Sequence, residues 1–169
     1  MITKSLFTDI LMIALLIALQ IFVLNRIVIM GKYTPVLYPI FVMFYPFFRN
    51  KFQFLGLSFL LGLGVDAFLG TWGINAFSTC VIAYFRTMIF RSSTDTSTDF
   101  FSFDSLMWSQ FLGYIFSSIW LHQFFVQYLE FFKFNFKILE ILLNISVTAV
   151  ISFIFILLYA LMFRVKQKV

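Results

Sequence analysis

The stretch Gly62–Ala76 reads GLGVDAFLGTWGINA and interrupts a long apolar part of the chain with one aspartate, one asparagine and four glycines. On a helix, Gly62, Asp66 and Gly70 are spaced four residues apart and share one face. Small residues on such a face let a second helix approach closely, so the carboxylate points into the helix contact rather than into lipid. The stretch therefore predicts a helical hairpin whose two arms pack tightly.

Two roles are open for Asp66. A carboxylate in the hydrocarbon core costs at least a few kcal/mol, which makes an intramembrane aspartate a functional-site residue by default. Alternatively, Asp66 lies near the membrane surface, about one turn from the end of its segment, and caps the helix that starts at Trp72. In both interpretations this hairpin is the least lipid-like part of the chain.

The composition is that of an integral membrane protein. The chain has 169 residues, of which 62% are hydrophobic and 11% charged, and its mean hydropathy is +1.01. A water-soluble domain of this size could not cover such a surface with polar groups. The net charge of +5 does not indicate nucleic-acid binding, because the basic residues stand singly between apolar runs. The length indicates a single transmembrane domain, residues 1–169.

Six apolar segments predict an all-α, polytopic membrane protein of six transmembrane helices. The segments are Ser5–Leu24, Pro35–Phe48, Phe52–Leu69, Trp72–Phe90, Leu106–Leu129 and Ile141–Phe163. The second segment is short and contains all three prolines, Pro35, Pro39 and Pro46. Prolines remove backbone donors and bend a helix. We therefore expect this segment to be kinked or partly non-helical and packed against its neighbours.

The basic residues predict that both termini are cytoplasmic. With six spans, the side that holds the termini carries eight lysines and arginines, namely Lys4, Arg49, Lys51, Arg86, Arg91, Arg164, Lys166 and Lys168. The other side carries four, namely Arg26, Lys32, Lys133 and Lys137. The richer side faces the cytoplasm in membrane proteins. This orientation depends on the second segment, because without its crossing the termini would lie on opposite sides.

Polar side chains inside the segments fall into two layers when depth is counted at about 1.5 Å per residue. Asp9 and Arg86 lie about one turn inside the cytoplasmic ends of the first and fourth segments. They form a charge pair if these segments are neighbours; alternatively, each side chain extends to its own interface. The outer layer, whose members can share hydrogen bonds, comprises Gln20, Asp66, Asn75, His122 and Gln127.

The sequence predicts neither a catalytic site nor a metal site. His122 is the only histidine and has no second ligand at metal-binding spacing, so we interpret it as a packing residue. Cys80 is the only cysteine, which excludes a disulfide within the chain. Ser78 and Cys80 lack a base at helical spacing. We therefore expect no enzymatic activity and no cofactor.

The Gly-rich stretch and the proline-bearing segment before it resemble the rod shape-determining protein MreD family. The family's typical pattern is Gly-Leu-x-x-Asp, then Gly, then Gly-x-Asn-Ala and a later Tyr. The resemblance covers roughly Pro35 to Arg86, and Tyr38 also matches the family. Matching positions in the hairpin are Gly62, Asp66, Gly70, Gly73, Asn75, Ala76 and Tyr84. The chain departs from the pattern by an extra glycine and by its polar RSSTDTSTD loop.

The resemblance implies a non-enzymatic protein of the bacterial cytoplasmic membrane. Members of the family act in the elongasome, the assembly that carries out peptidoglycan synthesis during rod-shaped growth. The implied partners are the scaffold MreC, the transglycosylase RodA with its penicillin-binding transpeptidase, and the MreB filament. The implied fold is that of the substrate-binding subunits of energy-coupling-factor vitamin transporters.

That implied fold leaves a second function open, that of a vitamin-binding transporter subunit. Ala14 and Ala18 resemble the small-residue motif by which such subunits dock on their transport partner. A vitamin site needs several convergent polar groups beneath an outer loop, and the outer layer would supply some of them. We favour the scaffold function, because we expect the outer layer to be thin enough to be used up in helix–helix hydrogen bonds. A structural membrane subunit unrelated to either is the third alternative.

Overall fold

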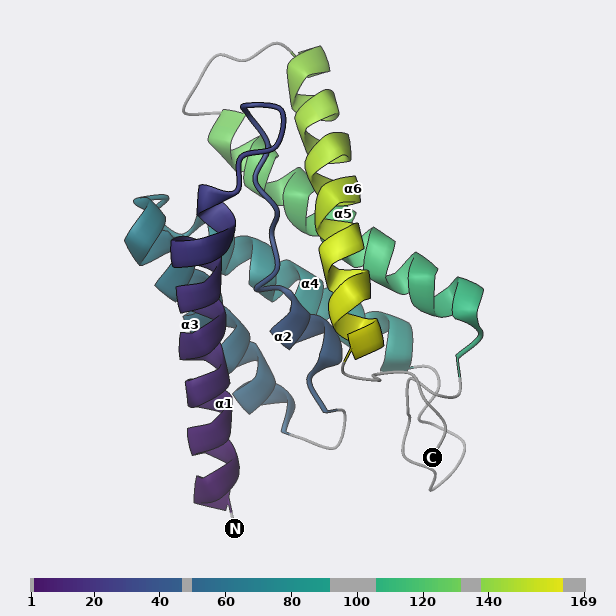
Figure 1. Cartoon of the computed structure of the whole chain (residues 1–169). Coiled ribbons are helices and arrows are strands. Elements are labelled where there is room, and N and C mark those ends of the chain that lie inside the picture. Colours follow the sequence, from purple (N-terminus) through teal and green to yellow (C-terminus); the bar gives the residue numbers. More distant parts are fainter. Residues whose placement is uncertain (1, 47–49, 92–105, 132–137, 163–169) are drawn as a thin grey trace.

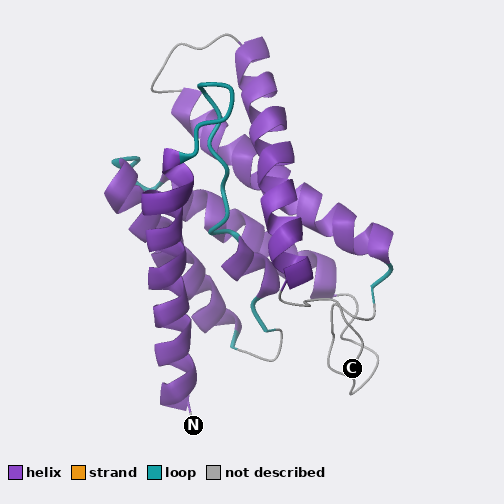
Figure 2. Cartoon of the chain, in the orientation of Figure 1, coloured by secondary structure: helices purple, strands orange, loops and turns teal. Residues whose placement is uncertain are grey.

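A computed structural model of the chain describes residues 2–46, 50–91, 106–131 and 138–162. These residues form helices joined by turns and one extended segment, without a strand (Figure 2). The polar stretch at 92–99 lies outside the described residues. The helices are α1 (Ile2–Ala18), α2 (Ile40–Phe44), α3 (Lys51–Leu69), α4 (Ile74–Arg91), α5 (Trp108–Phe131) and α6 (Ile138–Met162), and α1 continues as a π-helical turn (Leu19–Val23) and a 3₁₀ turn (Leu24–Arg26).

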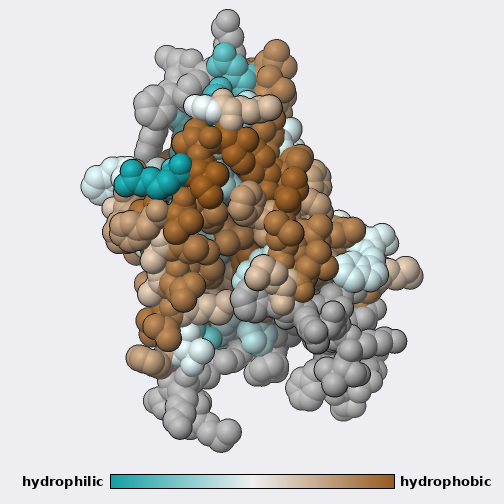
Figure 3. All heavy atoms as spheres, in the orientation of Figure 1, coloured by the Kyte–Doolittle hydropathy of each residue, from teal (hydrophilic) through white to brown (hydrophobic). Residues whose placement is uncertain are grey.

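Three helical stretches are long and apolar enough to cross a membrane: Leu6–Arg26, Lys51–Leu69 and Ile138–Met162, with mean hydropathies of 2.5, 1.7 and 2.7. Their outward faces carry large apolar side chains, and the visible surface over α1 and α6 is almost continuously hydrophobic (Figure 3). Such a surface is stable only against lipid or another apolar partner. The chain is therefore a membrane protein.

The second predicted transmembrane helix is mostly not helical. Residues 27–39 lack regular helix, and α2 contains only five residues. Pro39 stands at the N-cap of α2, and the helix ends before Tyr45, whose backbone is extended. The prolines explain this, because each lacks a backbone donor and restricts the residue before it. The expectation of a kinked or partly non-helical second segment is confirmed.

The segment from Val36 to Tyr45 lies between two hydrophobic clusters. Ile40 and Met43 pack into a cluster built mainly from α5 and α6. Phe41 and Val42 pack into a second cluster built mainly from α1, α3 and α4. The segment is drawn in dark blue through the centre of the bundle, leading to α2 (Figure 1). It therefore joins the two halves of the core.

Side chains from the surrounding helices bind the backbone of this central segment. Gln20 accepts the N–H of Leu37 at 2.9 Å and donates to the carbonyl of Pro35 at 3.0 Å. Ser152 of α6 accepts the N–H of Val36 at 2.9 Å. Irregular backbone survives at membrane depth only where protein satisfies its polar groups, and this segment meets that condition.

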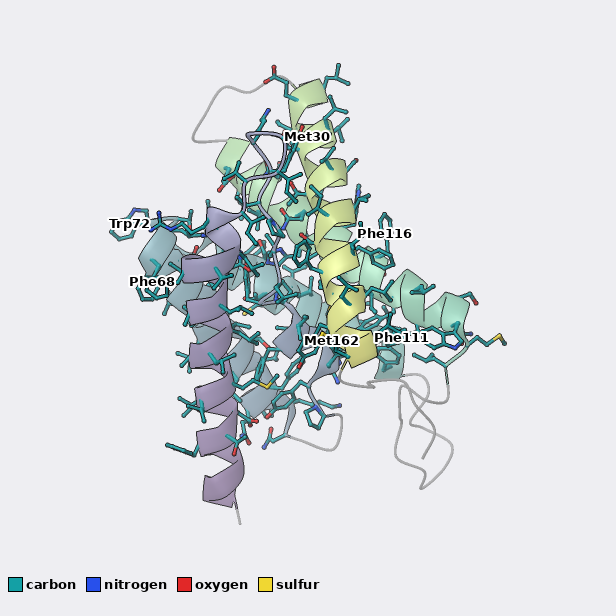
Figure 4. All side chains as sticks on the ribbon, viewed as in Figure 1. Met30, Phe68, Trp72, Phe111, Phe116 and Met162 are labelled. Carbon is teal, nitrogen blue, oxygen red and sulfur yellow. The ribbon has the colours of Figure 1, made fainter. Side chains whose placement is uncertain are left out.

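The hairpin of α3 and α4 is the most extensive helix contact in the described part of the chain. The two helices are joined by the short turn that contains Trp72. Trp72 and Phe68 project outward from this end of the hairpin (Figure 4). Aromatic side chains in such positions are typical of membrane–water interfaces.

Candidate functional site

Asp66, which is only 3% exposed, joins the two arms of the hairpin through its carboxylate. The carboxylate accepts the backbone N–H groups of Asn75 at 3.0 Å and Ala76 at 2.8 Å. It also accepts the Asn75 side-chain amide at 3.0 Å and the hydroxyl of Thr71. The first N–H groups of a helix have no partner within the helix. Asp66 therefore caps α4, while its side chain lies in the contact between the two arms.

Gly62 allows the close approach of α4, as the spacing predicts. A Cβ atom at this position would lie 2.5 Å from the Cα of Ala76 and 2.5 Å from the carbonyl oxygen of Asn75, and would also meet Thr79. Real Cβ atoms essentially never lie so close to backbone atoms. Only glycine therefore fits here without separating the helices.

Gly70 has a different role from the one its spacing predicts. A Cβ atom at Gly70 would meet nothing within 4 Å, but its φ is +69°. Gly70 follows the last residue of α3 in the left-handed conformation that commonly ends a helix, and Gly73 in the same turn has a φ of +91°. The prediction that Gly70 makes a close helix contact is wrong, because α3 ends one residue before it.

Gly64, the extra glycine relative to the family pattern, lies against α1. A Cβ atom here would meet the side chain of Ile17, at 3.4 Å from its Cγ1 atom and closer to its Cδ1 atom. Gly62 and Gly64 therefore serve two different helix contacts from one turn of α3. No partner for Gly64 could be predicted from the sequence, because this contact depends on which helix lies beside α3.

A hydrogen-bonded chain leads from the hairpin into α5. The Tyr38 hydroxyl donates to Asn75 Oδ1 at 2.7 Å and lies 2.8 Å from His122 Nε2. Because the hydroxyl has one proton and gives it to Asn75, His122 Nε2 carries a proton and donates to Tyr38. His122 is completely buried. Three of the predicted outer-layer residues are therefore brought together, and Tyr38, which we did not assign to the layer, is the residue that connects them.

The other two predicted outer-layer residues lie around a cavity. Gln20 is buried and is held by the central segment and by Asn25, whose Oδ1 accepts its amide at 2.9 Å. Gln127 is one turn beyond Gln123 on α5, and both line the cavity. The cavity has a volume of about 330 Å³ and is bounded by the end of α1, the following loop, α3, α4, α5 and α6. Its polar lining residues are Gln20, Asn25, Lys32, Tyr33, Thr34, Tyr38, Asn75, Gln123, Gln127, Glu130, Asn144 and Thr148.

Two amide groups at this cavity have no hydrogen-bond partner among the described residues. They are the Nε2 donor of Gln123, a side chain that is 2% exposed, and the Oδ1 acceptor of Asn144. The sequence predicts that the outer layer is used up in helix–helix hydrogen bonds. Gln123 and Asn144 are not members of that layer, so the prediction did not cover them. Each stands one turn before another polar residue that lines the cavity, Gln127 on α5 and Thr148 on α6, and of these four only Gln127 was predicted.

A second polar cluster joins Asp9 and Arg86 through Tyr45. The Tyr45 hydroxyl donates to Asp9 Oδ2 at 3.0 Å, and Arg86 donates to the Tyr45 carbonyl oxygen. The Arg86 guanidinium also lies 4.9 Å from the centre of the Phe54 ring. Arg86 is 3% exposed, so its side chain is enclosed by the protein. The structure therefore brings the two predicted residues to one cluster.

Arg86→Ala is expected to lower the free energy of unfolding by about 2–3 kcal/mol, because it removes a buried, charged hydrogen-bond donor. Tyr45→Phe, which removes only the hydroxyl bond to Asp9, should cost about 1 kcal/mol. Arg26→Ala removes the same side chain from an exposed position and is the matched control. The measurement is thermal unfolding in mild detergent, and equal midpoints for the two arginine variants would contradict this account.

Within the described ranges, no group of three or more His, Cys, Asp or Glu side chains gathers in a way that would hold a metal ion. Cys80 is a free thiol and is half-buried on α4. The polar groups brought together here bind one another or line the cavity. Comparison of the chain with protein-family models, curated proteins and solved structures finds no match.

Proposed function

We propose that the chain is a non-enzymatic membrane subunit of the elongasome that maintains cell shape by holding proteins of lateral peptidoglycan synthesis together. The observation that carries the proposal is that Asp66 and Asn75 are joined by hydrogen bonds across the hairpin. The residues by which the chain resembles the MreD family are those that tie α3 to α4 and, through Tyr38, to the central segment and α5. The motif thus supports a rigid body with apolar outer faces, which suits a scaffold in the membrane.

The proposed partners are those of the family. MreC is the first, followed by RodA with its penicillin-binding transpeptidase and by the MreB filament. A scaffold needs a fixed shape more than a reactive group. The central segment, bound by side chains of α1 and α6, supports such a fixed shape.

The proposed topology has six crossings with both termini in the cytoplasm. The central segment, which includes α2, makes the second crossing, although α2 is only five residues long. Reporter fusions after Val169 and within residues 92–99 are expected to give cytoplasmic signals, because eight of the basic residues fall on that side. A fusion at Met30, in the loop after α1, should report the opposite side. An external signal at either of the first two positions would contradict this topology.

A second function, a vitamin-binding subunit of an energy-coupling-factor transporter, is favoured by one observation. The cavity of about 330 Å³ has several polar groups beneath the loop after α1, and its size is within the range of small-molecule sites. The resemblance to the MreD family also implies the fold of such subunits, and we propose that fold for this chain.

Deletion of the gene separates the two functions. On the scaffold proposal, the cells become round and grow without any added vitamin. On the transporter proposal, the cells keep their rod shape and require a vitamin in minimal medium. Restoration by the full chain is the control in both cases. Rod-shaped deletion cells with a vitamin requirement would overturn the scaffold proposal.

A further inference from the structure

We infer that the outward face of α4 pairs with the same face of a second copy of this chain, with Tyr84 at the centre of the contact. This inference goes beyond the scaffold function and does not depend on it. The face recurs every three or four residues along the helix, and its exposed or half-buried residues are Phe77, Cys80, Val81, Tyr84, Thr87 and Met88.

Tyr84 lies near the middle of the membrane. α3 is long and apolar enough to cross, and α4 runs back along it after a short turn, with 18 residues against 19 in α3. The two helices therefore lie at the same depth. At a rise of about 1.5 Å per residue, Tyr84 lies about 15 Å from the start of α4 at Ile74 and about 10 Å from its end at Arg91. The hydrocarbon core is about 30 Å thick, so neither surface is near.

The hydroxyl of Tyr84 indicates that lipid alone does not cover this face. Tyr84 is 61% exposed, and side chains on a helix tilt toward its N-terminus, so the ring is directed away from the nearer end at Arg91. The Thr87 hydroxyl binds the Tyr84 carbonyl oxygen at 2.6 Å, but no hydrogen bond within the described residues uses the Tyr84 hydroxyl. A hydroxyl without a hydrogen bond in hydrocarbon is costly, and lipid chains offer it no partner. A protein that brings a hydrogen-bonding group to this depth would stabilise it.

A second copy of the chain supplies a matching group at the same depth. Copies in one membrane share a topology, so a two-fold axis along the membrane normal places each residue of the face against its equivalent. A tyrosine hydroxyl is both a donor and an acceptor, so two Tyr84 hydroxyls can bind each other. The face has no charged residue, because Arg86 is buried on the other side of α4, and its pairing therefore brings no like charges together. Its spacing is also that of parallel helix pairs.

Oxidative cross-linking of the full chain in native membranes tests the pairing. Cys80 is the only cysteine, lies one turn before Tyr84 and is half-buried, so the proposed contact holds two Cys80 thiols close together. Copper phenanthroline is expected to give a disulfide-linked dimer of this chain on a non-reducing gel. Val150→Cys in a Cys80→Ser chain is the matched control, because Val150 is exposed at the middle of α6, and it should give much less dimer. No dimer through Cys80, or an equal yield with the control, would overturn the inference.

Tyr84→Phe then tests the hydroxyl by itself. It should raise the dissociation constant of the dimer about three- to tenfold, the size of one hydrogen bond between helices in a membrane. The measurement is sedimentation equilibrium in mild detergent. Tyr128→Phe is the matched control, because it removes the hydroxyl of an exposed tyrosine near the end of α5, outside the face, and it should leave the constant unchanged. A native chain that stays monomeric at every concentration, or equal constants for the native chain and Tyr84→Phe, would overturn the assignment.

Discussion

Gly62→Leu is expected to abolish folded protein in the membrane. The new side chain would begin 2.5 Å from the Cα of Ala76 and from the carbonyl oxygen of Asn75. Backbone atoms cannot turn away as a flexible side chain can, so α3 and α4 must separate. Separation also takes Asp66 away from the N–H groups that it caps. We expect a loss of at least about 3 kcal/mol, at the upper end of overpacking effects.

Gly56→Leu is the control on the same helix. A Cβ atom at Gly56 would meet nothing within 4 Å, and leucine favours the helix over glycine by about 1 kcal/mol. The measurement is the amount of monodisperse protein recovered from membranes, by size-exclusion chromatography of a fluorescent fusion. Gly62→Leu should give almost none, and Gly56→Leu should match the native chain. Equal recovery of the two variants would contradict the close contact at Gly62.

Asp66→Ala is expected to have the second largest effect, about 3 kcal/mol of unfolding free energy. The carboxylate accepts two backbone N–H groups of α4, the Asn75 amide and the Thr71 hydroxyl. Alanine would leave these buried donors without an acceptor, and each such orphan costs about 1–3 kcal/mol unless water reaches it. The loss would also release Asn75, which positions the hydroxyl of Tyr38.

Graded variants test this explanation by thermal unfolding in mild detergent. Thr71→Val removes one of the four hydrogen bonds and should cost about 1 kcal/mol. Asp66→Asn keeps one acceptor oxygen but turns the other into a donor that faces the N–H of Ala76. Its loss of unfolding free energy should therefore fall between the losses of Thr71→Val and Asp66→Ala. An Asp66→Ala chain as stable as the native one would show that the cap does not hold the hairpin.

The sequence predicted the features that depend on local spacing. The face shared by Gly62 and Asp66 follows from helical periodicity, and the irregular second segment follows from its prolines. Gly70 shows the limit of this reasoning. It shares the spacing of Gly62, but α3 ends before it, and a position after a helix end has no helix face.

The features that the sequence did not predict depend on contacts between distant residues. Tyr38 is 84 positions from His122 in the chain, yet its hydroxyl joins the hairpin to α5. Gln123 lies on α5 and Asn144 on α6, and the packing of α5 against α6 brings both to one cavity. Neither hydrophobic periodicity nor motif spacing contains this information.

Co-purification from native membranes in mild detergent, followed by mass spectrometry of the bound proteins, tests the proposed scaffold function most directly. The account predicts that the native chain brings MreC with it, together with RodA and its penicillin-binding transpeptidase, and that the Gly62→Leu chain does not. Recovery of the ATPase and transmembrane subunits of an energy-coupling-factor transporter, without any protein of cell-wall synthesis, would contradict it.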